Sequence, residues 1–268
     1  MAKQNLGKLE TQFFAYVQMR EKQTVQTGEI AEALNLDKNQ EGDLLSRLAK
    51  GGLIARVRPG LYLTPEKLPA GGSWTPDEIL ALNTLMKDCG GTYQICGPNA
   101  FNRYGWVNQV PNKIYAYNDK ISGERKIGAN EFSLIKVAKK RLGGTVQEIT
   151  KSDQKAVYSS KTRALIDAIY DWSRFNSLPE GYQWAKHELR REQIDPSDLI
   201  KTAIDYGNMG TLRRLGYLLE VEGISDNKLE KLEKEITSNS SFIPWDPVRP
   251  KRGTTNKRWG IVDNRGEN

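Results

Sequence analysis

The side-chain types that catalyse reactions are sparse in this sequence and form no known constellation. The single histidine, His187, has no serine or cysteine at a signature spacing and is expected on the surface of a helix. Asp167 and Asp171 are four residues apart, which would place two carboxylates on one helix face and could hold a metal ion. Arg163 and Arg174 nearby favour an ordinary solvated face instead. The sequence therefore predicts a protein that is not an enzyme and needs no metal or cofactor.

Basic residues, in contrast, stand where phosphate contacts could form. The 268 residues carry 40 Lys and Arg against 33 Asp and Glu, a net charge of +7 that raises the expectation of an anionic partner. Arg56 and Arg58 alternate along a short predicted strand that ends at the Pro59-Gly60 turn. Two further basic groups could extend a nucleic-acid-binding surface, although charge runs are usually solvated faces: Lys136, Lys139, Lys140 and Arg141, and Arg249, Lys251 and Arg252.

The cysteine content and the hydropathy pattern bear on the compartment. Cys89 and Cys96 are too few for a disulfide framework and, beside one histidine, for a zinc site. No apolar run approaches the roughly 20 residues of a membrane span, and the N-terminus lacks the apolar core of a secretory signal. We expect a cytoplasmic protein with no membrane partner.

Two short helices must position the basic hairpin. The first is predicted from Thr27 as its N-cap, with Ile30 and Leu34 on its apolar face. The second begins at Asp37, which forms a capping box with Gln40. This second helix should bury Leu44, Leu45, Leu48 and Ala49. Its polar side is predicted to hold Asn39, Asp43, Ser46, Arg47 and Lys50. Helix, turn, helix and basic hairpin together predict a winged helix-turn-helix that places its second helix in the major groove.

The rest of the chain predicts an α+β fold: an N-terminal winged helix-turn-helix domain, then a mixed α/β domain with a helical C-terminal part. The predicted boundaries are 1–68 for the DNA-binding domain, 69–75 for a linker, 76–240 for the second domain and 241–268 for a basic C-terminal segment. Strands are predicted at residues 92–96, 113–117 and 132–137, with a brief helix at 98–104 between the first two. One helix should open with Thr75 as its cap and another with Asp195 as its cap and Pro196 at its first position. Arg213 and Arg214 should stay near the surface of a later helix. The C-terminal segment is either a basic arm or an irregular stretch pinned by Trp245 and Trp259.

Three stretches carry a resemblance to a known family. They are GLIARVRPGLYLTP in the predicted wing, YQICGPNAFNRYGWVNQVPNKIYAY in the second domain and TLRRLGYLLEVEG in a predicted helix. In this order they resemble the AbiEi-type antitoxins of bacterial abortive-infection toxin–antitoxin pairs, a type IV system of phage defence. The resemblance extends from the first helix to about Glu222.

This resemblance implies an antitoxin that is also the transcriptional repressor of its own operon. Its winged helix would bind inverted repeats in promoter DNA, and its C-terminal domain would neutralise a nucleotidyltransferase-like toxin, in many accounts without a stable complex. Carried over by position, the DNA contacts fall on Asn39, Gln40, Arg47, Arg56 and Arg58. The exposed side of the second helix adds Lys50 to these DNA-binding residues. Pro59 stands where a basic residue is also common in such wings.

Two alternatives belong to other classes. The chain could be a winged-helix regulator whose second domain senses a small molecule, which a ligand-induced rise in melting temperature would reveal. It could instead be a nucleic-acid-processing enzyme with the winged helix as docking module, which metal-dependent turnover abolished by Asp167→Ala would reveal.

Overall fold

The chain has a mixed α+β fold. The computed structural model describes residues 6–68, 73–236 and 241–266, so most of the predicted linker, residues 69–72, lies outside the described residues, as do residues 237–240 just before the predicted start of the C-terminal segment. Two compact units are present. The first unit comprises Met1–Thr92, Lys120–Leu134 and Ile149–Ala156, and the second unit comprises Tyr93–Asp119, Ile135–Glu148 and Val157–Asn268.

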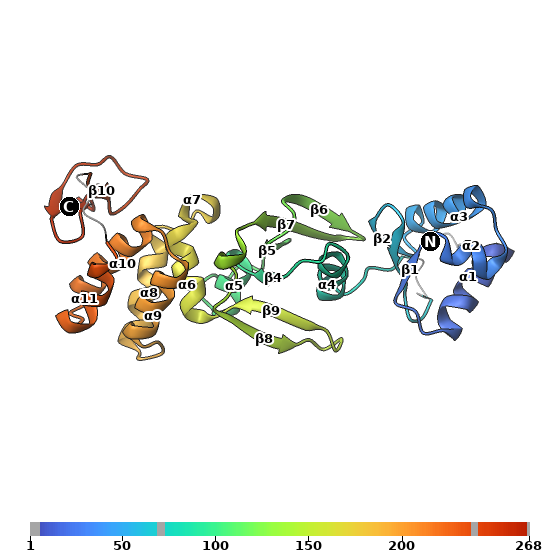
Figure 1. Ribbon diagram of the computed structural model, residues 1–268, viewed down its shortest axis with the longest axis horizontal. Coiled ribbons are helices and arrows are strands. Elements are labelled where there is room, and N and C mark those ends of the chain that lie inside the picture. The colour runs from blue at the N-terminus through green and yellow to red at the C-terminus, as the bar shows by residue number, and fades with distance from the viewer. Residues whose placement is uncertain (1–5, 69–72, 237–240, 267–268) are drawn as a thin grey trace. The chain divides into compact units, whose positions relative to one another are not determined.

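The first unit begins with three helices and a small sheet (Figure 1). Its elements up to the fourth helix are α1 (Lys8–Met19), β1 (Thr24–Gln26), α2 (Glu29–Leu34), α3 (Lys38–Lys50), β2 (Ala55–Arg58), β3 (Leu61–Leu63) and α4 (Glu78–Asp88). The sheet has the order β1-β3-β2 and is antiparallel, with Val25 opposite Tyr62 and Arg56 opposite Tyr62 on the other side. The β2–β3 hairpin predicted around Pro59-Gly60 is therefore confirmed.

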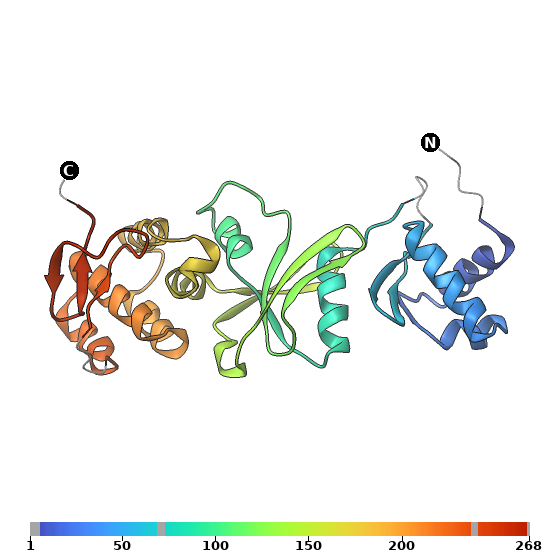
Figure 2. The same cartoon turned by 90° about the horizontal axis from the view of Figure 1, so that it is seen from above.

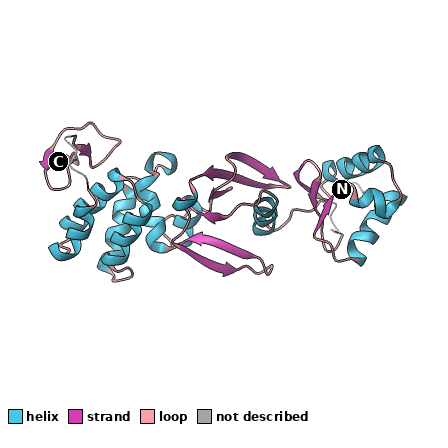
Figure 3. Cartoon of the chain, viewed as in Figure 1, coloured by secondary structure: helices cyan, strands magenta, loops and turns pink. Residues whose placement is uncertain are grey.

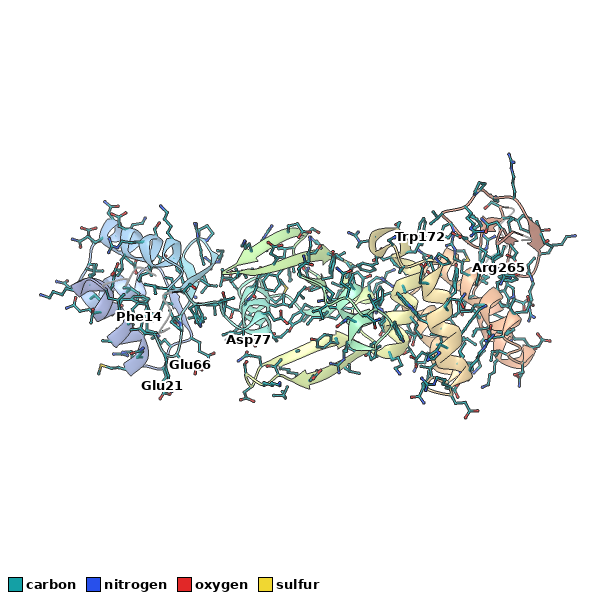
Figure 4. All side chains as sticks on the ribbon, turned by 180° about the vertical axis from the view of Figure 1, so that it is seen from behind. Phe14, Glu21, Glu66, Asp77, Trp172 and Arg265 are labelled. Carbon is teal, nitrogen blue, oxygen red and sulfur yellow. The ribbon has the colours of Figure 1, made fainter. Side chains whose placement is uncertain are left out.

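A hydrophobic core holds α1, α2 and α3 together. Phe14, labelled in Figure 4, is 1% exposed and packs edge-on against Phe13. The apolar face predicted for the second helix is buried at Leu44, Leu45 and Leu48. Burying a side chain of this size contributes about 1.5–3 kcal/mol, so this face fixes which side of α3 is turned outward.

Helix starts in this unit were only partly predicted. The capping box at Asp37 is confirmed, since its carboxylate accepts from the backbone N–H groups two and three residues on. The N-cap predicted at Thr27 was wrong, because α2 begins after Gly28. The cap predicted at Thr75 was also wrong: Asp77, labelled in Figure 4 at the start of α4, accepts from Ile79 and Leu80 N–H at 2.9 and 3.0 Å.

A six-stranded mixed sheet follows, in the order β6-β7-β5-β4-β9-β8. Its strands and the short helix between the first two are β4 (Tyr93–Ile95), α5 (Pro98–Arg103), β5 (Ile114–Asn118), β6 (Gly123–Ile127), β7 (Asn130–Lys136), β8 (Thr145–Ile149) and β9 (Lys155–Ser159). β4 runs antiparallel to β5 and parallel to β9. The strands β4, β5 and β7 and the helix α5 match the predicted runs, whereas β6, β8 and β9 were not predicted.

Helices dominate the remainder of the second unit (Figure 3). They are α6 (Lys161–Tyr170), α7 (Trp172–Phe175), α8 (Glu180–Arg190), α9 (Pro196–Tyr206), α10 (Met209–Val221) and α11 (Asp226–Lys234). Helix α9 has the predicted Asp195 cap, whose carboxylate accepts from Ser197 N–H at 2.6 Å. Along the described residues, no helix is long and apolar enough to cross a membrane.

The C-terminal segment forms a small sheet near these helices (Figure 2). Its strands β10 (Ile243–Pro244), β11 (Thr254–Asn256) and β12 (Ile261–Asp263) have the order β10-β12-β11. Trp245 is 3% exposed and Trp259 is fully buried in the core of the helices. The prediction that the two tryptophans pin this segment is therefore confirmed, whereas the prediction that the segment is irregular was wrong, because it forms a sheet.

Candidate nucleic-acid interface

The N-terminus of α2 is held by a buried carboxylate from α3. Glu41 is 1% exposed, and its carboxylate accepts from the backbone N–H groups of Gly28, Ile30 and Ala31 at 2.8–3.1 Å. These are the N–H groups that an α-helix leaves without partners at its start, and a negative charge there also interacts favourably with the helix dipole. The anchor sets α2 and α3 in one fixed arrangement. A sequence pattern does not reveal it, because Glu41 looks like an ordinary acidic residue of a first helical turn.

The polar face of α3 is exposed as predicted, but two of its side chains are already engaged. Asn39 and Lys50 are exposed. Gln40 is exposed as well, although its side-chain oxygen accepts from Asp37 N–H at 3.0 Å in the capping box, so only its amide nitrogen remains to donate. Arg47 lies 2.9 Å from a carboxylate oxygen of Glu10 on α1, which offsets part of its charge.

The two arginines of the hairpin differ in their surroundings. Arg56 is exposed, and its guanidinium makes no ion pair with the described residues. Arg58 instead donates through two nitrogens to both carboxylate oxygens of Asp88, each at 2.6 Å, and also to the carbonyl of Pro59. The Arg58 guanidinium lowers the pKa of the Asp88 carboxyl. Arg56 is therefore the more available cation of this hairpin.

The basic group between β7 and β8 does not act as one surface. Lys136, Lys139 and Lys140 are exposed. Arg141 turns inward, with its side chain 11% exposed, stacks over the Tyr170 ring at 3.7 Å and approaches Asp167 at 3.3 Å. Arg141 therefore does not share an exposed surface with the three lysines, and anion binding by this group stays a prediction.

A buried ion pair lies beside Arg141. Arg163 and Asp167 are both 0% exposed and 2.9 Å apart, so the predicted solvated face was wrong. Arg163 also donates to the carbonyls of Gly143 and Arg141, and Ser159 donates to the second oxygen of Asp167. Burial raises the pKa of the Asp167 carboxyl, although the neighbouring arginines oppose this. The pair is fully hydrogen-bonded and joins α6 to the segment before β8, which is a structural role.

Arginines of α10 are also buried, contrary to prediction. Arg213 is 3% exposed and donates to the carbonyls of Trp259, Ser241 and Gly260. The packing of Trp259 over Gly216 accounts for this, because it brings the C-terminal backbone down onto α10. These arginines hold the C-terminal segment in place.

The three basic residues of the C-terminal segment that were predicted to bind nucleic acid, Arg249, Lys251 and Arg252, are exposed. Arg249 donates to the carbonyl of Arg265 at 2.6 Å and lies 3.2 Å from Asp246, so it is held within the segment. Lys251 and Arg252 are exposed in the loop before β11. Among the described residues, no group of His, Cys, Asp or Glu is arranged to hold a metal ion.

Comparisons with known proteins bear on the fold. No family model and no curated protein sequence matches the chain. The crystal structure of the RV2827C protein from Mycobacterium tuberculosis is similar, with a TM-score of 0.60 over 98% of this chain and 94% of that chain. The two sequences are 11% identical, so the likeness concerns the mixed α+β fold alone.

Proposed function

We propose that the first three helices and the β2–β3 hairpin form a winged helix-turn-helix that binds double-stranded DNA. The observation that carries the proposal is the Glu41 carboxylate, which locks α2 onto α3 while the polar side chains of α3 and Arg56 of the hairpin stay exposed. A rigid pair of helices with one exposed polar face has the form needed to enter the major groove.

In this proposal, different exposed side chains contact the bases and the phosphates. Asn39, near the start of α3, has an amide that can pair with the edge of an adenine, and Lys50 at the far end contributes charge. Arg56 contacts phosphate from the hairpin. Arg58 contributes less than its position suggests, because Asp88 holds its guanidinium.

Titrations of duplex DNA at several salt concentrations test this division. The DNA is the fragment upstream of the gene and a scrambled duplex of equal length. We expect Arg56→Ala to weaken binding to both and to reduce the salt slope by about 1, whereas Asn39→Ala relaxes the preference for the upstream fragment. Lys231→Ala on α11 removes the same charge from an exposed site in the second unit and serves as the control. Equal losses in all three variants would reject the proposal.

The pairing of Arg58 gives a second test with the opposite sign. Asp88→Asn removes the carboxylate charge that Arg58 now faces, so DNA affinity should rise and its salt dependence should steepen. In an Arg58→Ala background the same substitution should have a smaller effect. An Asp88→Asn protein that binds DNA no better than the parent would remove Arg58 from the interface.

We further propose, from the family resemblance, that the protein is the antitoxin and autorepressor of a toxin–antitoxin operon. The promoter's inverted repeats and a nucleotidyltransferase-like toxin would be its partners. The test is growth with the neighbouring reading frame expressed alone, with this chain, and with this chain lacking Met1–Leu68. Rescue by both forms would support an antitoxin activity outside the DNA-binding part. Absence of toxicity or of rescue would contradict the antitoxin role and leave the DNA-binding proposal standing.

A further inference from the structure

A pocket of about 530 Å³ in the second unit has no part in the proposed DNA binding. Three segments line it: the turn after α5, the start of α6 and the C-terminal half of α8 with the residues that follow it. The lining side chains that could contact a ligand are Tyr104, Trp106, Lys161, Trp184, Glu188 and Arg191.

One wall of the pocket is a stack of aromatic rings. Trp106 and Trp184 lie nearly parallel, 15° apart, with ring centroids separated by 5.6 Å, and Tyr104 continues from Trp106 at 5.3 Å. All three rings are only partly buried, whereas Phe101 behind them is 2% exposed. Planar groups such as nucleobases stack on such rings.

The polar groups of the pocket favour a negatively charged ligand. Glu188 is 5% exposed and accepts from Trp106 Nε1 at 2.8 Å and from Lys161 Nζ at 2.9 Å, so its charge is offset inside the wall. Burial raises its pKa, but the hydrogen bonds from Trp106 and Lys161 together with nearby charge, chiefly that of Lys161, keep the pKa of Glu188 below its ordinary value. The carboxylate therefore stays ionised and holds both the indole and the ammonium in position.

Arg191 gives the rim a cation that no carboxylate neutralises. It is exposed, one of its guanidinium nitrogens lies 3.2 Å from His187 Nε2, and no ion pair joins it to an acidic side chain of the described residues. Two cations thus face one already paired carboxylate in the pocket, which disfavours a cationic ligand such as a quaternary ammonium. An arginine at the edge of an aromatic wall suits a phosphate group.

We propose that this pocket binds a nucleotide, whose base stacks on the wall formed by Tyr104, Trp106 and Trp184 while its phosphate pairs with Arg191. The same chemistry could be presented by a free nucleotide or by the end of a single-stranded nucleic acid. The site is distinct from α3 and the hairpin, so neither proposal depends on the other.

Calorimetric titration of the full chain tests the site. The probes are ATP, adenosine and a short single-stranded RNA oligonucleotide, and tetramethylammonium tests the opposite charge. We expect ATP or the oligonucleotide to bind with a Kd below roughly 1 mM, and adenosine to bind on the order of tenfold more weakly than ATP where the free nucleotide is the ligand. Saturation by the oligonucleotide alone would assign the site to a strand end, and saturation by ATP alone would assign it to a free nucleotide.

Variants assign the binding to this pocket. Arg191→Gln should weaken binding on the order of tenfold, whereas Arg190→Gln, a neighbour that pairs with Glu222 outside the pocket, should leave it unchanged. Trp184→Phe should retain binding and Trp184→Leu should lose it, with thermal unfolding followed in parallel to show that each variant is folded. Binding of tetramethylammonium in place of nucleotides, no binding of any probe, or equal affinities for the two arginine variants would overturn the proposal.

Discussion

Removal of the Glu41 carboxylate should loosen α2 from α3. Glu41→Ala leaves three backbone N–H groups without an acceptor, and a buried donor in that state costs about 1–3 kcal/mol. The Ile30 N–H is buried and stays unsatisfied, whereas those of Gly28 and Ala31 are partly buried and can regain water. We therefore expect a loss of about 3 kcal/mol for Glu41→Ala, a large fraction of the ~5–15 kcal/mol typical of a folded domain.

The isosteric substitution separates charge from shape. Glu41→Gln retains one acceptor but loses the charge that strengthens each hydrogen bond, so we expect roughly half of the loss seen for Glu41→Ala. Asp43→Asn is the matched control, since it removes the same charge from an exposed position of the same helix. It should change stability by less than about 0.5 kcal/mol.

Urea unfolding followed by circular dichroism measures the loss, and hydrogen exchange locates it. Exchange should speed up at the amides of residues 28–31 in both Glu41 variants and stay slow in Asp43→Asn. If Glu41→Gln and Asp43→Asn unfold at the same urea concentration, with unchanged exchange at these amides, the Glu41 carboxylate does not hold α2 in place.

Three further predictions concern a glycine of α10, the carboxylate of Asp263 and the two cysteine thiols. Gly216→Ala should destabilise by at least about 1–3 kcal/mol in urea unfolding, because the added methyl would lie 2.1 Å from the Trp259 ring. Hydrogen bonds from Arg265 lower the pKa of Asp263 from 3.8 to about 2. The Asp263 carboxylate therefore stabilises the fold by about 1 kcal/mol above pH 4, and this stabilisation is lost as the pH falls towards 2. Asp263→Asn should abolish that part of the acid dependence. A thiol reagent should modify the partly exposed Cys89 in the native protein but reach Cys96 only on unfolding, because Cys96 is fully buried and burial raises its pKa well above the ordinary value.

Each of these predictions has a control or a contrary result. Gly42→Ala places a methyl on α3 with nothing within 4 Å, so it should stabilise by about 0.5–1 kcal/mol; an equal gain for Gly216→Ala would contradict the close packing. Asp43→Asn should leave the acid dependence intact, and an unchanged acid profile in Asp263→Asn would contradict the stabilising effect of the Asp263 carboxylate. Equal reaction rates of the two thiols in native protein would contradict the burial of Cys96.

Local signals predicted much of the fold. The capping box at Asp37 and the Asp195 cap followed by Pro196 depend on residues within one turn, and α3 and α9 begin where those signals lie. The apolar face of Leu44, Leu45 and Leu48 follows from helical spacing alone.

The sequence did not predict features that depend on contacts between residues far apart in the chain. The start of α2 depends on Glu41, which lies ten or more residues away, and an acidic side chain carries no mark of that destination. Arg163 and Asp167 have the spacing of a solvated pair, but the carbonyls of Gly143 and Arg141 complete their hydrogen bonding in the interior.

The strand β8 was missed because it has no buried side. Every one of its residues is exposed, so it lacks the alternation of buried and exposed side chains by which a strand is recognised. The nucleotide pocket was equally hidden, because Trp106 and Trp184 are far apart in sequence and an aromatic residue usually indicates core.

Hydrogen exchange of the full chain with and without its upstream duplex tests whether α3 and the hairpin bind DNA. We expect slower exchange in α3, residues 38–50, and in the β2–β3 hairpin, residues 55–63, with little change in the helices α6–α11. A scrambled duplex at higher salt should give less protection at the start of α3. Protection confined to the second unit, or none in α3 under conditions where the duplex is bound, would contradict recognition of DNA by this helix and hairpin.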